Sequence, residues 1–201
     1  AERGFSFSRS GPLDMRMSSS GPSAGDLVNG AAEDELVRVL RDYGEERRAR
    51  RVARAIAEAR RRQPIRTTDE LARLVAGAVG GGSQRIHPAT RTFQALRIAV
   101  NDELGQLERF VGPAVRALRP EGRIAIISFH SLEDRIVKHS LRRLAGACVC
   151  PPEAPACSCN PERLVEVLTR RAERPSADEV AANPRARSAR LRVARRLGVE
   201  A

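Results

Sequence analysis

Three side chains that can take part in chemistry stand together at Phe129, His130 and Ser131, directly after the apolar run of residues 124–128. The run predicts a short buried strand, and the charged residues that follow it predict a helix. Ligands bind beyond the carboxyl ends of strands in open α/β sheets. We therefore expect a cleft here, with Ser128 and His130 as the candidate catalytic groups and the proton acceptor left open.

A structural explanation competes for the same residues. Ser131 followed three positions later by Asp134 is a capping-box pattern, and Glu133 with Asp134 favours the positive end of a helix dipole. We interpret the two carboxylates as structural, and Ser131 as either a helix cap or part of the site. His130 is either a group that lines the cleft or a polar residue that merely ends the strand.

Four cysteines form a second cluster, with the spacing C-x-C-x6-C-x-C: Cys148, Cys150, Cys157 and Cys159. Four thiolates this close in sequence, in a loop turned by prolines, can close tetrahedrally on one Zn²⁺. The commoner zinc spacing is C-x2-C, so free or redox-linked thiols remain an alternative, as do disulfides in an isolated preparation. A zinc ion would have a structural role and no catalytic one.

The chain is strongly basic, with a formal net charge of +11, and a single one of its 36 basic residues, Lys138, is a lysine. Arginine makes planar, bidentate contacts with phosphate, so this surface predicts a polyanionic partner, most simply nucleic acid. A bias in genomic base composition is the alternative explanation for the choice of arginine. Charge alone separates neither RNA from DNA nor an enzyme from a passive binder.

No apolar run approaches the roughly 20 residues that a membrane span needs. The opening stretch AERGFSFSRSGP lacks the apolar centre of a signal peptide. We therefore interpret the chain as cytoplasmic, without a membrane partner, and leave its oligomeric state open. The chain begins at Ala1 without a capping signal, which raises the expectation that it is a fragment.

The first half of the chain predicts a loop followed by helices. Residues 1–30, rich in Gly, Ser, Pro and Arg, predict a loop, and residues 31–86 predict a helical subdomain. Periodicity indicates three helices in this subdomain: one that ends at Gly44, one over 45–62, and one with Thr68 as its N-cap.

Residues 87–201 predict an α/β unit. A long helix is expected from Pro88, with a break near Gly112 and Pro113, before the strand that precedes Phe129. The Cys-rich loop and three further elements follow: loop 146–162, a strand over 164–171, a short helix or turn over 176–184, and a strand or helix over 188–197.

Several long motifs, in matching order, resemble the MraW-type family of bacterial 16S rRNA (cytosine-N4) methyltransferases. LRPEGRIAIISFHSLEDRIVK (118–138) resembles the fifth-strand region of these Rossmann-like enzymes. The other stretches that carry the resemblance are RGFSFSRSGPLDMRM (3–17), YGEERRARRVARAIAEAR (43–60), HPATRTFQALRIAVNDEL (87–104) and NPRARSARLRVARR (183–196).

The resemblance implies an α/β fold: a partial Rossmann-like class I methyltransferase sheet with an inserted all-helical subdomain for RNA recognition. It implies transfer of a methyl group from S-adenosyl-L-methionine to the N4 amine of cytidine 1402 of 16S rRNA, near the decoding site of the small ribosomal subunit. This amine is a poor nucleophile, so it must be aligned with the methyl donor, and its base must leave the stack.

The resemblance also implies roles for individual residues. Gly4 and Phe5 would border the cofactor, Asp14 with Arg16 would tie down their loop, and Phe93 is expected in the core. The residues implied to contact substrate RNA carry aromatic, basic or hydroxyl side chains: Arg3, Phe7, Arg16, Arg47, Arg51, Arg54, His87, Arg91, Phe129 and Ser131.

The family's Gly-rich cofactor loop, which follows its first strand, has no counterpart here, because Gly80–Gly82 follow a predicted helix. The resemblance places the main cofactor site before Ala1, as in an N-terminally truncated enzyme, and we expect the 201-residue chain alone to be inactive. The alternative function is a non-catalytic basic RNA- or DNA-binding module with a structural zinc site. Composition alone accepts this alternative, but the family-like motifs argue against it.

The cysteine spacing generates a prediction about metal content. If the four thiolates hold a structural ion, freshly purified and reduced protein contains about one equivalent of zinc by elemental analysis. Less than about a tenth of an equivalent would favour the thiol or disulfide alternatives.

Overall fold

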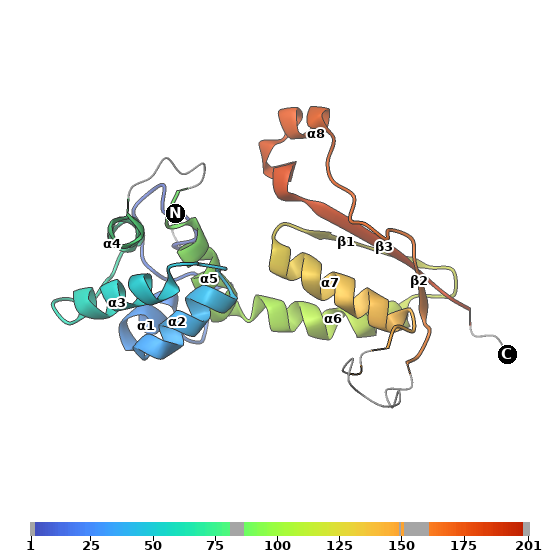
Figure 1. Ribbon diagram of the computed structural model, residues 1–201, viewed down its shortest axis with the longest axis horizontal. Helices are drawn as coiled ribbons and strands as arrows, with labels where there is room; N and C mark the ends of the chain where they lie inside the picture. Colours follow the sequence, from blue (N-terminus) through green and yellow to red (C-terminus); the bar gives the residue numbers. More distant parts are fainter. Residues whose placement is uncertain (1–2, 81–86, 149, 151–160, 199–201) are drawn as a thin grey trace. The chain divides into compact units, whose positions relative to one another are not determined.

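The computed structural model describes residues 3–80, 87–148, 150 and 161–198 (Figure 1). The chain divides into two compact units, the helical unit (Ala1–Glu103) and the sheet unit (Leu104–Ala201). Within the described ranges, no helix has the length and apolarity that crossing a membrane requires. The expected functional division into a core loop, an inserted RNA-recognition subdomain and half of a methyltransferase sheet stays a prediction.

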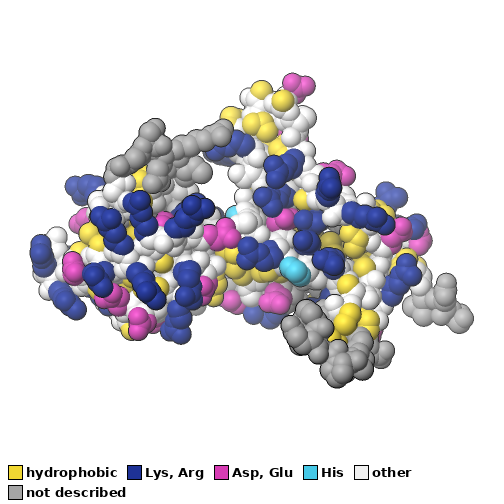
Figure 2. Space-filling model, in the orientation of Figure 1, with side chains coloured by type: hydrophobic (Ala, Val, Ile, Leu, Met, Phe, Trp, Pro, Cys, Tyr) yellow, Lys and Arg dark blue, Asp and Glu magenta, His cyan; other side chains and the backbone are white. Residues whose placement is uncertain are grey.

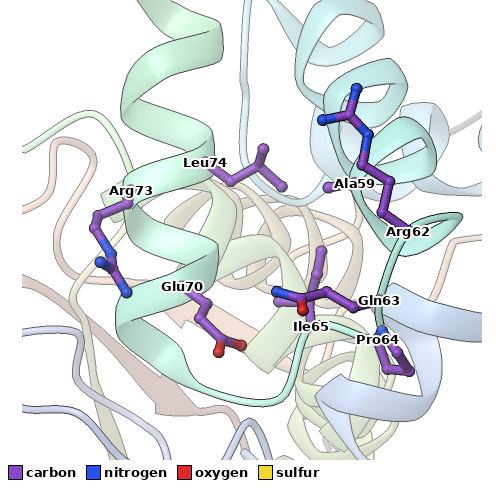
Figure 3. A pocket seen from close by; sticks show the side chains of 8 residues that line it. All are labelled: Ala59, Arg62, Gln63, Pro64, Ile65, Glu70, Arg73 and Leu74. Carbon is purple, nitrogen blue, oxygen red and sulfur yellow. The ribbon is translucent and has the colours of Figure 1, made fainter.

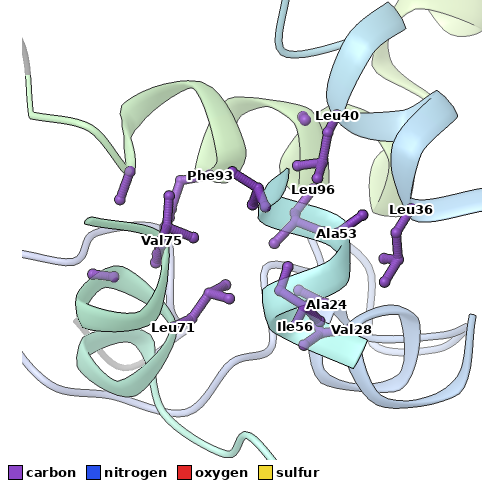
Figure 4. Close-up of a cluster of buried hydrophobic side chains, with 14 of the residues drawn as sticks. Ala24, Val28, Leu36, Leu40, Ala53, Ile56, Leu71, Val75, Phe93 and Leu96 are labelled. Carbon is purple, nitrogen blue, oxygen red and sulfur yellow. The ribbon is translucent and has the colours of Figure 1, made fainter. Parts of the chain in front are cut away.

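The helical unit consists of α1 (Ala24–Gly30), α2 (Glu33–Asp42), α3 (Ala49–Arg60), α4 (Thr68–Val79) and α5 (Thr90–Asn101). One face of each helix is apolar, and these faces meet in a common core. Figure 4 shows side chains of that core, among them Leu36, Leu40, Ile56, Val75 and Leu96. The three helices expected between residues 31 and 86 are confirmed, with shorter bounds for the second.

Residues 1–30 do not form a loop throughout, because α1 occupies their last part. Ser23 and Asp26 form a reciprocal capping box at its start. Ala24 and Val28 are fully buried in the core of the helical unit. The sequence expectation missed α1 because a helix this short has little periodicity of its own, and packing stabilises it.

The segment that precedes α1, here called the opening loop, is fixed to the start of α4. Thr67, and not Thr68 as expected, is the N-cap: its hydroxyl accepts from the amide of Glu70 at 3.4 Å, and the Glu70 carboxylate accepts from the amide of Thr67 at 3.1 Å. Thr68 is buried. Its hydroxyl donates to the carbonyl of Arg9 at 3.1 Å and accepts from the amide of Gly11 at 3.2 Å. Thr68 therefore joins the opening loop to the helices.

Gly44 follows the end of α2, as expected, and packing explains why it is a glycine. A Cβ at this position would lie 2.6 Å from the carbonyl oxygen of Arg91 in α5 and 2.7 Å from that of Leu40. Only a residue without a side chain allows α2 and α5 to approach this closely.

The long helix expected from Pro88 is interrupted at Asp102, which adopts a left-handed conformation with φ 47°. The next helix, α6 (Glu103–Ala117), continues through Gly112 and Pro113, so the break expected there is wrong. A proline removes only one helical N–H, and the fully buried Val111 and Val115 hold α6 in place around it.

The sheet unit contains β1 (Arg123–Ser128), α7 (Ser131–Leu144), β2 (Val165–Val167), α8 (Ala177–Ala182), the 3-10 helix η1 (Pro184–Ser188) and β3 (Arg190–Arg196), besides most of α6. The strand order is β1-β3-β2, and both pairings are antiparallel. β1 and β2 are therefore parallel to each other, with β3 reversed between them. The expected strands are confirmed, but the one expected over 164–171 is limited to the three residues of β2. Within 188–197, β3 forms a strand rather than a helix, and Ser188 belongs to η1.

α6 and α7 supply the apolar layer that packs with the strands of the sheet. Val111 and Val115 of α6 share a buried cluster with Val137 and Leu141 of α7 and with Ala194 of β3. Figure 1 shows α6 and α7 running alongside each other in this unit.

A buried ion pair joins α7 to β3. Asp134 accepts from Arg192 at 2.6 Å and 3.2 Å, and from Arg190 at 3.0 Å. The side chains of Asp134 and Arg192 are each only 9% exposed. Hydrogen bonds from Arg192 and then Arg190 lower the pKa of Asp134, against the opposing effect of burial.

This ion pair generates a stability prediction. Asp134→Asn leaves the Arg192 guanidinium buried without its counter-charge, which costs about 3 kcal/mol of unfolding free energy in pairs of this kind. We expect the urea midpoint at pH 7 to fall accordingly. Asp178→Asn is the matched control, because Asp178 is exposed and makes no ion pair among the described residues.

The same pair predicts a pH dependence. The folded pKa of Asp134 lies below its unfolded value of about 3.9, so the pair's contribution is complete above about pH 4 and is lost as pH falls through the folded pKa. The unfolding free energy of the wild type should therefore decrease faster below about pH 4 than that of Asp134→Asn. Parallel acid profiles for the two proteins would contradict this assignment.

Candidate functional site

The turn between β1 and α7 is held by side chains that cap the helix. His130 is the N-cap: its Nδ1 accepts from the amide of Glu133 at 3.3 Å. The Glu133 carboxylate accepts from the amides of Phe129 at 2.8 Å and His130 at 3.2 Å. The expected cap by Ser131 with Asp134 is therefore wrong, because the Asp134 carboxylate turns to β3 instead. The structural interpretation of both carboxylates is confirmed.

A pocket of about 330 Å³ opens at this turn. Its lining comes from three stretches that are distant in sequence: Phe129, His130, Ser131, Arg174, Arg187, Ser188, Ala189 and Arg190. The cleft expected beyond the carboxyl end of this strand thus exists. Phe129 is 55% exposed, whereas Ser128 is only 2% exposed and does not line the pocket.

Sequence reasoning did not identify Arg174, Arg187 and Arg190 as site residues. The sequence predicts for the segment with the last two only a strand or helix and a resemblance to the family's closing segment. The signal that could have found Arg187 and Arg190 is the concentration of arginines just before a strand, in NPRARSARLR. Their meeting with Phe129 depends on strand pairing, in which Arg190 lies opposite Ser128.

The opening loop is folded back on itself around Gly4. Gly4 is buried with φ 70°, and a Cβ there would lie 2.1 Å from the carbonyl oxygen of Pro12. The carbonyl of Arg3 accepts from the amide of Met15 at 2.8 Å. Phe5 is 37% exposed, with the Arg3 guanidinium 5.7 Å from its ring centre. Gly4 is therefore explained by backbone packing, and Arg3 and Phe5 are accessible.

Asp14 and Arg16 tie down the same loop, as expected. Asp14 accepts two hydrogen bonds from the Arg16 guanidinium, each 2.8 Å long, and Arg16 donates to the carbonyl of Gly21 at 3.1 Å. The Arg16 side chain lowers the pKa of Asp14 from 3.8 to about 2. An RNA contact by Arg16 would have to share a guanidinium that already holds the loop.

Phe7 and His87 lie against each other. Their ring centres are 4.6 Å apart and nearly parallel, and Phe7 meets Phe93 edge-on at 5.0 Å. Phe93 is 5% exposed and belongs to the core, as expected. His87 also accepts from the amide of Ala89 at 3.2 Å. Phe7 and His87 thus form one aromatic pair beside α5, and Arg91 is exposed on that helix.

The arginines expected to contact RNA at α3 lie on its accessible side. Arg47 precedes the helix, and Arg51 and Arg54 are exposed on it, whereas its opposite face is buried. Figure 2 shows basic side chains in dark blue over the visible face of the helical unit, with acidic ones between them. Arg60 differs, because it donates to the carbonyls of Val28 and Ala31 and therefore stabilises the fold.

A second pocket, of about 450 Å³, lies between the end of α3 and α4 (Figure 3). Glu70 and Arg73 line it, but both are engaged: Glu70 bonds backbone amides at the start of α4, and Arg73 pairs with Asp69 at 2.8 Å. The remaining lining includes Arg62, Gln63 and apolar groups. This pocket therefore offers no acid–base pair for catalysis.

The described residues include half of the cysteine cluster. The amide of Cys150 donates to the sulfur of Cys148 at 3.4 Å. Cys157 and Cys159 lie outside the described residues. The zinc site therefore stays a prediction.

The fold and the motifs together define the class of protein. An α/β sheet with its helical layer, preceded in the chain by a helical unit, is a partial Rossmann-like fold of the class I methyltransferase type. The chain belongs to the MraW methylase family, whose model matches residues 1–197. The resemblance of the sequence motifs to this family is thereby confirmed.

Curated relatives agree with this assignment. The Ribosomal RNA small subunit methyltransferase H of Geobacter sulfurreducens is 56% identical over 200 residues, and that of Syntrophus aciditrophicus is 54% identical over 200 residues. Each match covers 98% of this chain and 64% of the relative. The protein of the same name from Anaeromyxobacter dehalogenans is 54% identical over 199 residues, with the same coverage. The chain thus spans about 64% of the length of these relatives.

Proposed function

We propose that this protein is a cytoplasmic, S-adenosylmethionine-dependent methyltransferase that modifies the N4 amine of cytosine 1402 in 16S rRNA of the small ribosomal subunit. The observation that supports it most is the family match over residues 1–197, together with relatives named for small-subunit rRNA methylation. The basic surface agrees with a polyanionic substrate.

The cofactor's use is proposed on family grounds. Gly4 and Phe5 are the candidates in this chain, but the carbonyl of Pro12 fills the place of a Cβ at Gly4. Phe5 offers only an accessible ring. The described residues do not by themselves form a site that fits S-adenosylmethionine. What they offer is a means of holding RNA.

Ser128 and His130 remain the candidates for accepting a proton or hydrogen bond from the cytosine amine, and the structure favours them unequally. Nδ1 of His130 already accepts a backbone hydrogen bond, and its Nε2 lies 3.3 Å from the Glu133 carboxylate. Proton transfer to Nδ1 would break the helix cap, so His130 is better suited to positioning the turn than to acting as a base. Ser128 is buried and lies beside that turn in sequence.

RNA binding in this proposal uses the arginines of α3 together with the accessible residues of the opening loop, the aromatic pair of Phe7 and His87, and Arg91. Arginine neutralises phosphates, and aromatic rings hold bases that have left the stack. The target base must leave its stack before the methyl group can reach it. Phe129 and Ser131, which follow β1, are the candidates proposed to contact the target base.

A segment replacement tests the activity. The 200 matched residues of the Geobacter sulfurreducens relative are replaced by those of this chain, and the chimera is expressed in a bacterium that lacks its own enzyme. We expect N4-methylcytidine to return to the 16S rRNA, measured by mass spectrometry of its nucleosides. The unmodified relative is the positive control.

A folded chimera that leaves the rRNA unmethylated, while the relative restores it, would overturn the proposal. If such a chimera still bound the small subunit, the non-catalytic RNA-binding module would be the better description. If the chimera neither methylated the rRNA nor bound the small subunit, misfolding could explain both results. Circular dichroism of the purified chimera therefore accompanies the assay.

The α3 surface has its own prediction. Changing Arg47, Arg51 and Arg54 together to Gln should weaken binding to 16S rRNA fragments regardless of their sequence, and should reduce the salt slope of log K by about 2, at roughly 0.7–0.9 per lost phosphate contact. A fluorescence anisotropy titration at several salt concentrations measures both.

The matched control removes the same charge from the sheet unit, at the exposed Arg119, Arg123 and Arg143. An unchanged salt slope in the α3 variant would show that this surface is not the RNA face. An equal change in both variants would show that only net charge matters.

A further inference from the structure

The pocket at the end of β1 collects positive charge from separate parts of the chain. Arg174 is placed by the antiparallel bridge between Glu173 and Leu191, whose amides and carbonyls bond reciprocally at 3.0 Å. Arg187 lies in η1, and Arg190 begins β3. None of the described residues that line the pocket carries a carboxylate. Three arginines among the residues that line one cavity favour an anion as its occupant.

Two of these arginines make no ion pair with other described residues. Arg174 and Arg187 are exposed and make no ion pair within the described part of the chain, whereas Arg190 is shared with Asp134. Helix α7 contributes little to anion binding, because Glu133 and His130 already occupy amides at its start. The charge available to a ligand therefore comes from Arg174 and Arg187.

Phe129 adds a surface for a base. Phe129 lines the same pocket and is 55% exposed, although burial of an aromatic ring would be favourable. An accessible aromatic ring beside arginines is the arrangement by which proteins hold single-stranded nucleic acid: the base stacks, and the phosphate pairs with the guanidinium.

We propose that this pocket binds one nucleotide of single-stranded RNA, with its base on Phe129 and its phosphate between Arg174 and Arg187. The proposal rests on the rRNA substrate proposed above and assigns the part of that substrate held here. A cavity of about 330 Å³ lies at the lower end of the size of ligand pockets, which suits a single nucleotide.

The test uses the whole 201-residue chain and a fluorescein-labelled five-nucleotide oligocytidine, followed by anisotropy. The double variant Arg174→Gln/Arg187→Gln should weaken binding about tenfold at low salt and reduce the salt slope by about 0.7 for one lost phosphate contact. The control double variant Arg171→Gln/Arg185→Gln removes the same charge from neighbouring residues outside the pocket and should change affinity less than about twofold.

A second comparison tests the base. Phe129→Leu should weaken binding of the oligocytidine about fivefold or more, because stacking on an aromatic ring is lost. It should leave unchanged the binding of a matched oligonucleotide whose middle residue is abasic. Ultraviolet cross-linking of a 4-thiouridine version should label the tryptic peptide of residues 124–135, which contains Phe129.

Two results would overturn the inference. If the pocket and control double variants weakened oligocytidine binding equally, general electrostatic attraction would explain the binding without a specific site. Displacement of the RNA by millimolar inorganic phosphate, with no effect of Phe129→Leu, would mean that the pocket holds a free anion instead of RNA.

Failure here is distinguishable from failure of the proposed function. The chimera can restore methylation without any role for this pocket. Conversely, the pocket can bind the oligonucleotide in a protein that does not methylate.

Discussion

The carboxylate of Asp134, buried between Arg190 and Arg192, is the interaction on which the candidate site depends. It joins α7 to β3, and β3 is the strand that pairs with both other strands. Because Asp134 faces the sheet, Glu133 is the carboxylate left to bond the amides of the turn. Glu133 thereby fixes the backbone of Phe129, which lines the pocket. A buried charge can persist there only because two guanidinium groups compensate its lost hydration.

The opening loop has almost no secondary structure of its own, and polar contacts to several helices hold it in place. Thr68 bonds its backbone at the start of α4, and the side chain of Asn101, at the end of α5, bonds the carbonyl of Met15 and the amide of Met17, each at 2.7 Å. Gly4 closes the loop on itself. The accessible Arg3 and Phe5 are thereby presented from a fixed backbone, which reduces the entropy lost when a ligand binds.

Arginine serves two purposes in this chain. Some arginines belong to the fold, such as Arg60 and Arg196, which donate to carbonyls at the ends of α1 and α6. Others, such as Arg51, Arg174 and Arg187, are exposed. The net charge of +11 cannot separate these groups, because a guanidinium contributes the same charge in either role. Their partners in the structure decide which ones remain for RNA.

The sequence by itself determined the elements with strong local signals: the apolar strand before Ser128, the amphipathic α3, and Phe129, His130 and Ser131 as the residues at a strand end. Each depends on the side-chain pattern of a continuous stretch. Only the tertiary structure decided that Arg174 and Arg187 join Phe129, because antiparallel pairing brings together residues far apart in sequence. It also decided that His130 caps α7 instead of Ser131. The choice between these neighbours depended on which acid faced the sheet, and no local pattern contains that long-range contact.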